Sequence, residues 1–436
     1  MVKKLPLHDL FFWTSSFFLL GVLLGSATQL FSYKIIWIFV ATLILGILLR
    51  LRAGRIFLVL FILLGAIYFH VFDYFQKHPT PVFDQKIKFH ATVEKVDPKI
   101  NGQELTVKTD SPEIKLKIET FRYPAFNYGD YIKVEGKISK SKSEFINGVV
   151  YKPSIKLIES GRGWLIKKYL LKIRNDFENN LKKVLPYNQA VFLSGLTVGG
   201  RSEFSKELEE QFRQSGTLHL VALSGFNILI IVNYLGAFFL LFVSRRRAIF
   251  LTCFSIILFV LMTGAEASII RAAIMGFIVI LAEQSGRLFN IRNAITTAAL
   301  IMVLFNPKVL VFDLGFQLSF LALMGIVYLK PILEGYLPKL LKKKLWLKDE
   351  ILTTVSAEAV VLPVLFLKLG YASPWGIISN PLIALFIPLT MGLGFLTGAA
   401  GFISYYLSLP LGWLVNILLT YELAVIKVTS MLGGYF

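Results

Sequence analysis

The sequence predicts a polytopic α-helical membrane protein of about 11 transmembrane helices, with one small all-β domain inserted among them. Hydrophobic residues make up 55% of the 436 positions, Phe alone occurs 38 times, and the mean hydropathy is +0.66. Ordinary soluble domains are less apolar than this. Long apolar runs recur along the chain except between residues 79 and 160, where apolar and polar residues alternate.

The formal net charge of +19 is compatible with two kinds of partner. A nucleic acid would bind a basic chain, but the cytoplasmic loops of membrane proteins also concentrate Lys and Arg. The positions of the charged residues along the chain therefore distinguish these two explanations. The single cysteine, Cys253, lies in an apolar run, which excludes an intramolecular disulfide and a metal site built from cysteines.

Residues 1–78 form the first predicted domain, with transmembrane helices at 10–31, 35–49 and 56–75. Three arginines crowd the loop between the second and third helices: Arg50, Arg52 and Arg55. By the positive-inside rule this loop is cytoplasmic. The prediction therefore places the N-terminus in the cytoplasm and the following segment outside the cytoplasmic membrane.

Residues 79–160 form the second predicted domain, in which five segments have the period-two alternation of strands. Those segments are IKFHATVEKV, ELTVKT, EIKLKIET, DYIKVEGKI and VVYKPSIKLIE. Turn formers such as Asn101-Gly102 and Asn147-Gly148 separate them. Five short strands in fewer than a hundred residues predict an OB-type barrel, here an extracytoplasmic one.

The lysines of this barrel allow two interpretations. OB barrels bind nucleic-acid strands in basic grooves with aromatic platforms, which makes Lys115, Lys117 and Lys133 candidate DNA contacts. Acidic residues such as Glu94 and Glu104 are interleaved with the lysines, which is typical of a solvated surface. No aromatic platform can be recognised in the sequence.

Residues 161–214 form a third, amphipathic domain. The segment WLIKKYLLKIRNDFENNLKKVLP has charged and apolar residues at helical spacing, which predicts a helix on the membrane surface or against the barrel. The apolar segment 190–198 is too short to span, so we expect it to be re-entrant or buried. Gly199-Gly200-Arg201 then forms either a loop or an anion-binding nest, in which Arg201 is a further DNA-binding candidate. A second charged helix, SKELEEQFRQ, follows.

Residues 215–436 form the last predicted domain and contain eight further apolar spans. They are 217–243, 249–263, 267–283, 293–305, 312–329, 351–369, 377–400 and 405–432. Loops predicted to be cytoplasmic carry clusters of Arg and Lys, including Arg245 to Arg247 and Lys342 to Lys344, whereas the short outer loops carry few charges. Because cytoplasmic and outer loops alternate along these spans, the C-terminus is predicted to lie outside the cytoplasmic membrane.

The stretch SGTLHLVALSGFNILIIV at residues 215–232 is the most polar part of these spans. His219, Ser224 and Asn227 would each be unfavourable in lipid, and Gly225 weakens a helix but lets another backbone approach. We therefore expect this face to point toward protein or a hydrated cavity.

Other spans also contain residues that lipid cannot satisfy: Arg271, Asp313, Gln317, Glu358 and Asn380. We predict that His219, Ser224, Asn227, Arg271 and Gln317 converge on one polar cavity. The alternative for Arg271 is a structural ion pair with Glu358 or Glu422, which satisfies the same energetics.

Four segments in order resemble the membrane domain of the ComEC-type competence family. They are SGTLHLVALSGFNILII, TGAEASIIRAAIM, NPKVLVFDLGFQLSFLALMGI and the Asn-Pro pair at 380–381. The chain departs from the family at Asn227, where a second histidine is usual, and at Leu314, where proline is usual. The first departure removes a titratable group from the candidate path.

This resemblance implies a competence-type channel domain that internalises single-stranded DNA during natural transformation, with an OB-like domain outside the membrane. Family members usually carry a metallo-β-lactamase-like domain thought to degrade one strand, and we expect no strand-degrading activity here, because the chain ends at Phe436 without such a domain. We accordingly expect no catalytic residues, no metal site and no cofactor, because the five histidines are scattered.

The expected partners are single-stranded DNA and membrane lipid, with a separate nuclease, a DNA receptor, a cytoplasmic helicase motor and a homo-oligomeric copy as further candidates. Hydropathy alone fits two other functions equally well. One is a non-conducting membrane scaffold, and the other is a transporter of a different anionic polymer.

Overall fold

The computed structural model describes residues 7–27, 53–76, 83–100, 102–141, 143, 145–200, 204–221, 225–264, 267–284, 291–336, 346–370 and 373–433. The chain forms two compact units, one made of Met1–Lys77 with Ile274–Phe320 and the other of His78–Ala273 with Leu321–Phe436.

The first unit contains α1 (Leu7–Ala27), α3 (Ala53–Phe75), α11 (Ile291–Phe305) and α12 (Val309–Phe312). Helices α1 and α3 pack closely, because Gly21 lies against the backbone of Ile62 and Gly65 against that of Phe18. Small residues permit such close approach between membrane helices. The predicted helix at 35–49 lies outside the described residues.

Ion pairs join the helix ends of this unit. Asp9 at the start of α1 lies 3.2 Å from Arg292 at the start of α11. Asp73 near the end of α3 lies 2.7 Å from Lys308, which follows α11. Both pairs are consistent with the predicted topology, in which these three helices cross the membrane in the same direction.

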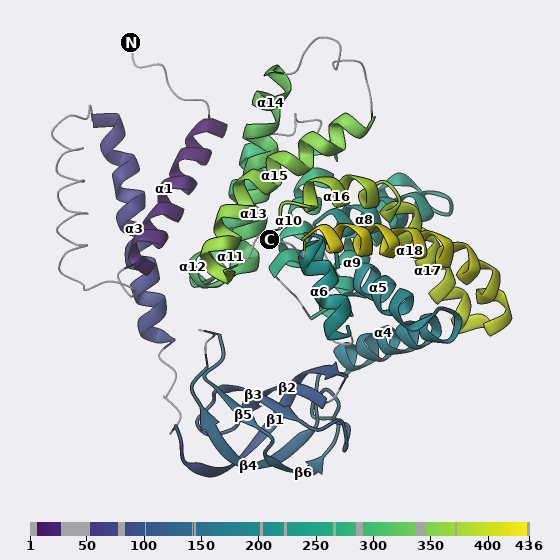
Figure 1. The fold of residues 1–436 in the computed structure, drawn as a ribbon. Coiled ribbons are helices and arrows are strands. Elements are labelled where there is room, and N and C mark those ends of the chain that lie inside the picture. The colour runs from purple at the N-terminus through teal and green to yellow at the C-terminus, as the bar shows by residue number, and fades with distance from the viewer. Residues whose placement is uncertain are drawn as a thin grey trace. The chain divides into compact units, whose positions relative to one another are not determined.

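The second unit begins with a β-barrel, shown in blue in Figure 1. Its strands are β1 (Lys86–Lys99), β2 (Gly102–Thr109), β3 (Lys115–Thr120), β4 (Tyr131–Ser139), β5 (Gly148–Tyr151) and β6 (Ser154–Glu159). The ring β1-β2-β3-β5-β4 closes through β1–β4 pairing, and β3 and β5 run parallel. Alternate residues such as Val93, Leu116 and Val134 fill the interior. The barrel is OB-like, as predicted.

The prediction of a single fifth strand was wrong. The segment is divided into β5 and β6 at Lys152-Pro153, where Lys152 has a φ of 44° and proline has no N–H to donate to a ladder. Strand β5 pairs with β3 and closes the barrel, whereas β6 pairs with β4.

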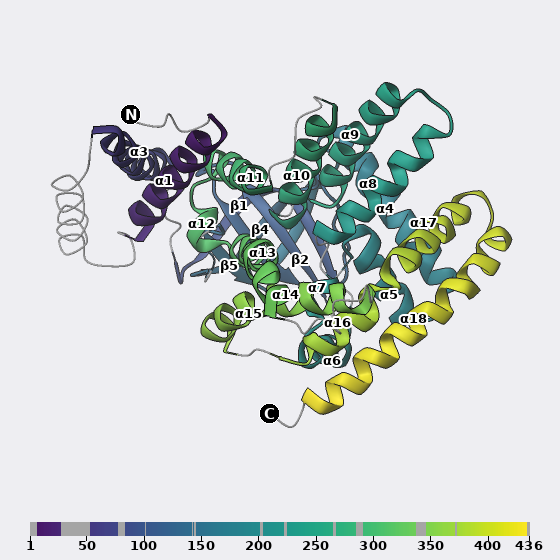
Figure 2. The same ribbon diagram turned by 90° about the horizontal axis from the view of Figure 1, so that it is seen from above.

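The amphipathic region forms α4 (Leu165–Val184), α5 (Tyr187–Val198) and α6 (Lys206–Gln214), which confirms the two charged helices. Helix α5 is buried from Ala190 to Val198, so the buried alternative for this short apolar segment is confirmed. It packs against α4, α17 (Ile387–Ile403) and α18 (Tyr405–Gly433). Helices α17 and α18 run side by side (Figures 1 and 2).

The remaining helices are α7 (Leu218–Val221), α8 (Gly225–Leu240), α9 (Arg245–Met262), α10 (Ala267–Gln284), α13 (Leu314–Met324), the π-helical η1 (Gly325–Leu329), α14 (Lys330–Tyr336), α15 (Trp346–Leu369) and α16 (Gly376–Ala384). The predicted span 377–400 is not one helix, because α16 and α17 meet at a 52° bend. Pro388 lies in the first turn of α17, where proline is favourable. Helix α15 runs through Pro363 without interruption.

Within the described residues, four helices are long and apolar enough to cross a membrane, and the bent pair α16–α17 would be a fifth span. The four are Asp9–Ser26, Leu314–Tyr336, Lys348–Lys368 and Tyr405–Gly433. Several other predicted spans correspond to shorter apolar helices, such as α8 with 16 residues and α11 with 15. A number near 11 therefore stays a prediction.

Candidate functional site

Buried polar groups of the second unit gather where the segment before α7 meets α16. We call this group the α16 junction. Its buried polar members are Ser215, Thr217, Glu358, Ser379 and Asn380, and Gly216 and Gly376 lie between them. They come from three parts of the sequence and lie among apolar helices.

The segment at 215–217 is held to α16 by short polar contacts. The hydroxyls of Ser215 and Thr217 lie 2.6 Å apart, and the Ser379 hydroxyl donates to the Ser215 carbonyl at 2.8 Å. Gly216 has a φ of 73°, and a Cβ on it would lie 2.7 Å from the backbone N of Gly376. Glycine therefore serves both the left-handed conformation and the close approach.

Glu358 on α15 pairs with Asn380 on α16. The Asn380 amide Nδ2 donates to Glu358 Oε1 at 2.7 Å, and the two residues are 9% and 5% exposed. A side chain at Gly376 would overlap the same carboxyl oxygen, so the absence of a Cβ makes room for the pair. Two of the segments that looked distinctive in the sequence, 215–219 and the Asn-Pro pair, thus meet at one place.

A second buried carboxyl lies between α17 and α18. The Thr390 hydroxyl donates to Glu422 Oε1 at 2.7 Å, and Glu422 is 0% exposed. Among the described residues, the ion pairs include neither Glu358 nor Glu422. The structure gives both carboxyls neutral donors rather than the arginine partner considered in the sequence analysis.

The start of α8 lies against α10. Asn227 is fully buried and donates from Nδ2 to the carbonyl of Leu196 on α5 at 3.2 Å. Gly225 faces Ala272, whose Cβ would be 3.8 Å from a Cβ at that glycine. Arg271, the neighbour of Ala272, is 2% exposed. Asn227 and Arg271 therefore belong to helices that meet near Gly225.

The structure does not bring all the predicted cavity residues together. His219 is exposed on α7, and Ser224 lies outside the described residues. Asp313 and Gln317 belong to the other unit and make local contacts. Asp313 Oδ1 accepts from the Phe316 N–H at 3.0 Å, and Gln317 Nε2 donates to two carbonyls of the α12 segment. Convergence of these residues on one cavity remains a prediction.

A family model described as Competence protein matches residues 196–435. The chain belongs to the Competence protein family. The matched residues include the whole α16 junction, Asn227, Arg271 and Glu422. The barrel of this competence-family chain precedes the matched residues.

One curated relative is ComE operon protein 3 of Bacillus subtilis (strain 168), which is 27% identical over 225 residues. The match covers 51% of this chain and 27% of the relative, so the matched segment spans about a quarter of that protein. No solved structure matches the chain.

The barrel lysines of this competence-family protein differ in their surroundings. The Lys115 ammonium lies 3.0 Å from Glu94, and that of Lys117 lies 2.8 Å from Glu104, so carboxylates already neutralise both. Lys133 is exposed, and no ion pair among the described residues includes it. Its register neighbours are His90 on β1 and Lys156 on β6. Arg201 lies outside the described residues.

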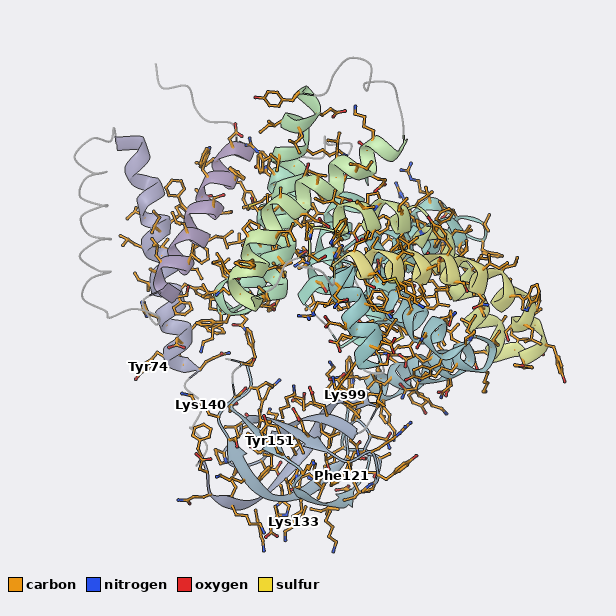
Figure 3. The ribbon with its side chains drawn as sticks, in the orientation of Figure 1. Tyr74, Lys99, Phe121, Lys133, Lys140 and Tyr151 are labelled. Carbon is orange, nitrogen blue, oxygen red and sulfur yellow. The ribbon has the colours of Figure 1, made fainter. Side chains whose placement is uncertain are left out.

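Exposed aromatic residues lie where β3 and β5 end, a feature missed in the sequence. Phe121 is 60% exposed, Tyr123 is 77% exposed and Tyr151 is 60% exposed. The Lys152 ammonium lies 5.5 Å from the centre of the Phe121 ring. Figure 3 labels Phe121, Lys133 and Tyr151 on the barrel. The parallel pairing of β3 with β5 brings these rings to the same end of the two strands. No local sequence pattern predicts that pairing.

The barrel is attached to α4 through Tyr128. Its hydroxyl accepts from the Trp164 N–H at 3.2 Å, and the Lys167 ammonium lies 4.5 Å from its ring centre. The same ammonium donates to the Glu94 carbonyl at 3.3 Å. Burial lowers the pKa of Lys167. Helix α4 is thus anchored to the barrel by specific polar contacts.

Within the described residues, no group of three His, Cys, Asp or Glu side chains could hold a metal ion.

Proposed function

We propose that this competence-family protein carries single-stranded DNA across the cytoplasmic membrane during natural transformation. The observation that carries the proposal is the family match over residues 196–435, the region whose apolar helices bury Asn227, Arg271 and the α16 junction. The relative's name, ComE operon protein 3, agrees with a role in competence.

Phosphates crossing a membrane need compensating positive charge, and Arg271 supports the proposal on this point. A guanidinium stays ionised at any physiological pH and binds phosphate through two parallel hydrogen bonds. Arg271 is 2% exposed on a helix next to the start of α8. We propose that the residues predicted to line the path are His219, Ser224, Gly225, Asn227, Arg271, Asp313, Gln317, Glu358 and Asn380.

The barrel is proposed to receive the strand outside the membrane. Stacking of bases on exposed aromatic rings and contact of phosphates with a neighbouring cation are how OB barrels bind single strands. Phe121, Tyr151 and Lys152 provide such a combination, and Lys133 adds an exposed charge. A nuclease, a DNA receptor and a helicase motor would then act as separate partners.

Uptake of fluorescently labelled DNA by a naturally transformable host tests the function. A strain lacking this gene should bind DNA at its surface but accumulate no nuclease-protected single strand in the cytoplasm, and the wild-type gene should restore it. Normal internalisation in the deletion strain would refute the proposal. If a variant that lacks one of the proposed path residues restores internalisation at equal protein abundance, the non-conducting scaffold is favoured.

A further inference from the structure

Among the described residues, one oxygen of Glu358 and one of Asn380 have no hydrogen-bond partner. One is Glu358 Oε2 and the other is Asn380 Oδ1, and both are buried. They are the remaining oxygens of two groups already joined by the bond from Asn380 Nδ2 to Glu358 Oε1 at 2.7 Å. Buried acceptors without a donor are unfavourable, and a buried carboxylate without a cation is far more so.

A single proton on Glu358 Oε2 gives both oxygens a hydrogen-bond partner. A carboxylic acid and a primary amide pair through two bonds, in which the amide N–H donates to the acid carbonyl and the acid O–H donates to the amide carbonyl. The first bond is present, and the two oxygens without partners are the donor and acceptor positions of the second. The charge of the carboxyl disappears at the same time.

Among the described residues, the charged groups around the pair make no ion pair with Glu358. Helix α15 packs most closely against α16, η1 and α14. No titratable residue occurs in α16, and η1 contributes only Tyr328, which is 49% exposed. On α14, Lys330 lies 2.9 Å from Asp349, and Glu334 lies 3.3 Å from Lys348. On α18, which packs against α16, Glu422 accepts from Thr390 and Lys427 is exposed.

The remaining charged residues of α15 are Glu350 near its start and Lys368 at its end. They are eight and ten residues from Glu358, which is more than about 10 Å along a helix at about 1.5 Å per residue. Neither of them contributes to an ion pair with Glu358 among the described residues.

We infer that Glu358 and Asn380 form a proton-binding site that ties α15 to the half-helix α16. Release of the proton leaves both buried acceptor oxygens without a donor, which favours separation of α15 from α16. Because α16 meets α17 at a 52° bend, the bound proton stabilises one arrangement of a broken helix. The inference concerns protonation and helix position, and it does not depend on DNA being the cargo.

Infrared difference spectroscopy of the full-length protein in lipid nanodiscs tests the site directly. A spectrum recorded between mildly acidic and mildly alkaline pH should contain the carbonyl stretch of a protonated carboxyl, and this band should be reduced in Glu358→Gln. Glu350→Gln on the same helix is the matched control and should leave the band unchanged. An identical band in wild type and Glu358→Gln would overturn the inference.

Thermal unfolding provides a second, independent measurement of the same protonation. The side-chain amide introduced by Glu358→Gln can form the same two bonds with Asn380 without a proton, so this variant should fold normally. A carboxyl that keeps its proton when folded and loses it on unfolding makes stability fall as the pH rises. Wild type should therefore lose melting temperature from acidic to alkaline pH more steeply than Glu358→Gln. Equal slopes would show that Glu358 does not release a proton on unfolding, and a glutamine variant that is less stable at every pH would show that the amide cannot replace the carboxyl; either result would overturn the inference.

Discussion

Replacement of Lys133 by Ala should weaken the binding of single-stranded DNA, whereas replacement of Lys117 should not. Lys133 is exposed on β4 between His90 and Lys156, and the described residues place no carboxylate at ion-pair distance from it. Lys117 lies 2.8 Å from Glu104, so a phosphate would have to replace a carboxylate that is already bound. The two lysines lie on β4 and β3 of the same barrel and differ in their pairing, which makes them a matched pair.

The expected changes in salt dependence and in Kd for Lys133→Ala follow from the loss of one exposed phosphate contact. Each phosphate contact on a single strand contributes about 0.7 to the slope of log K against log salt concentration, so the slope should become less steep by about 0.7 in Lys133→Ala. An exposed ion pair contributes up to about 1 kcal/mol, which corresponds to a Kd about fivefold higher at low salt. Both slope and Kd should stay at the wild-type values in Lys117→Ala.

The assay is fluorescence anisotropy of a labelled oligothymidylate titrated with the full-length protein in nanodiscs at several salt concentrations. Phe121→Ala should raise the Kd without changing the slope, because stacking is not ionic. Equal effects of Lys133→Ala and Lys117→Ala would refute the distinction between paired and unpaired lysines. An unchanged slope in Lys133→Ala would remove this lysine from the contact.

Three further predictions concern the helical region. Arg271→Leu should reduce uptake of labelled DNA per protein molecule while abundance stays near normal, because the loss removes a phosphate-binding cation; unchanged uptake per molecule would exclude the arginine from the path. Thr390→Val should lower the free energy of unfolding by about 1–3 kcal/mol, since it removes the donor to the buried Glu422 carboxyl, and an unaltered unfolding transition would mean that water or another group takes its place. A cysteine at Ser141 should react with a membrane-impermeant maleimide in intact cells and one at Lys343 should not; the opposite labelling would reverse the predicted topology.

The sequence predicted elements whose signal is local. Alternation along residues 87–138 located the first four strands of the barrel, and the charged helices α4 and α6 followed from their periodicity. The segment that became α5 was too short to span, so it was expected to be re-entrant or buried, and the structure buries it.

Features that depend on distant partners were not predictable in the same way. Glu358 and Asn380 are 22 residues apart on separate helices, and nothing in either helix indicates that one amide will meet one carboxyl. Arg271 was a reasonable ionic partner by charge alone, yet neutral donors from Asn380 and Thr390 reach the two carboxyls. Likewise, the division of the fifth strand depends on pairing of β5 with β3 rather than on composition.

Purified protein reconstituted into liposomes provides the most direct test of transport. A single-stranded oligonucleotide carrying a quencher would be added outside, with a fluorescent complementary strand trapped inside. Fluorescence quenching should require the protein and should be slower with Arg271→Leu at equal amounts of reconstituted protein. The vesicles must be sealed, and the measurement is repeated with a proton gradient imposed in each direction. If the wild-type protein causes no quenching under any of these conditions, it does not conduct DNA.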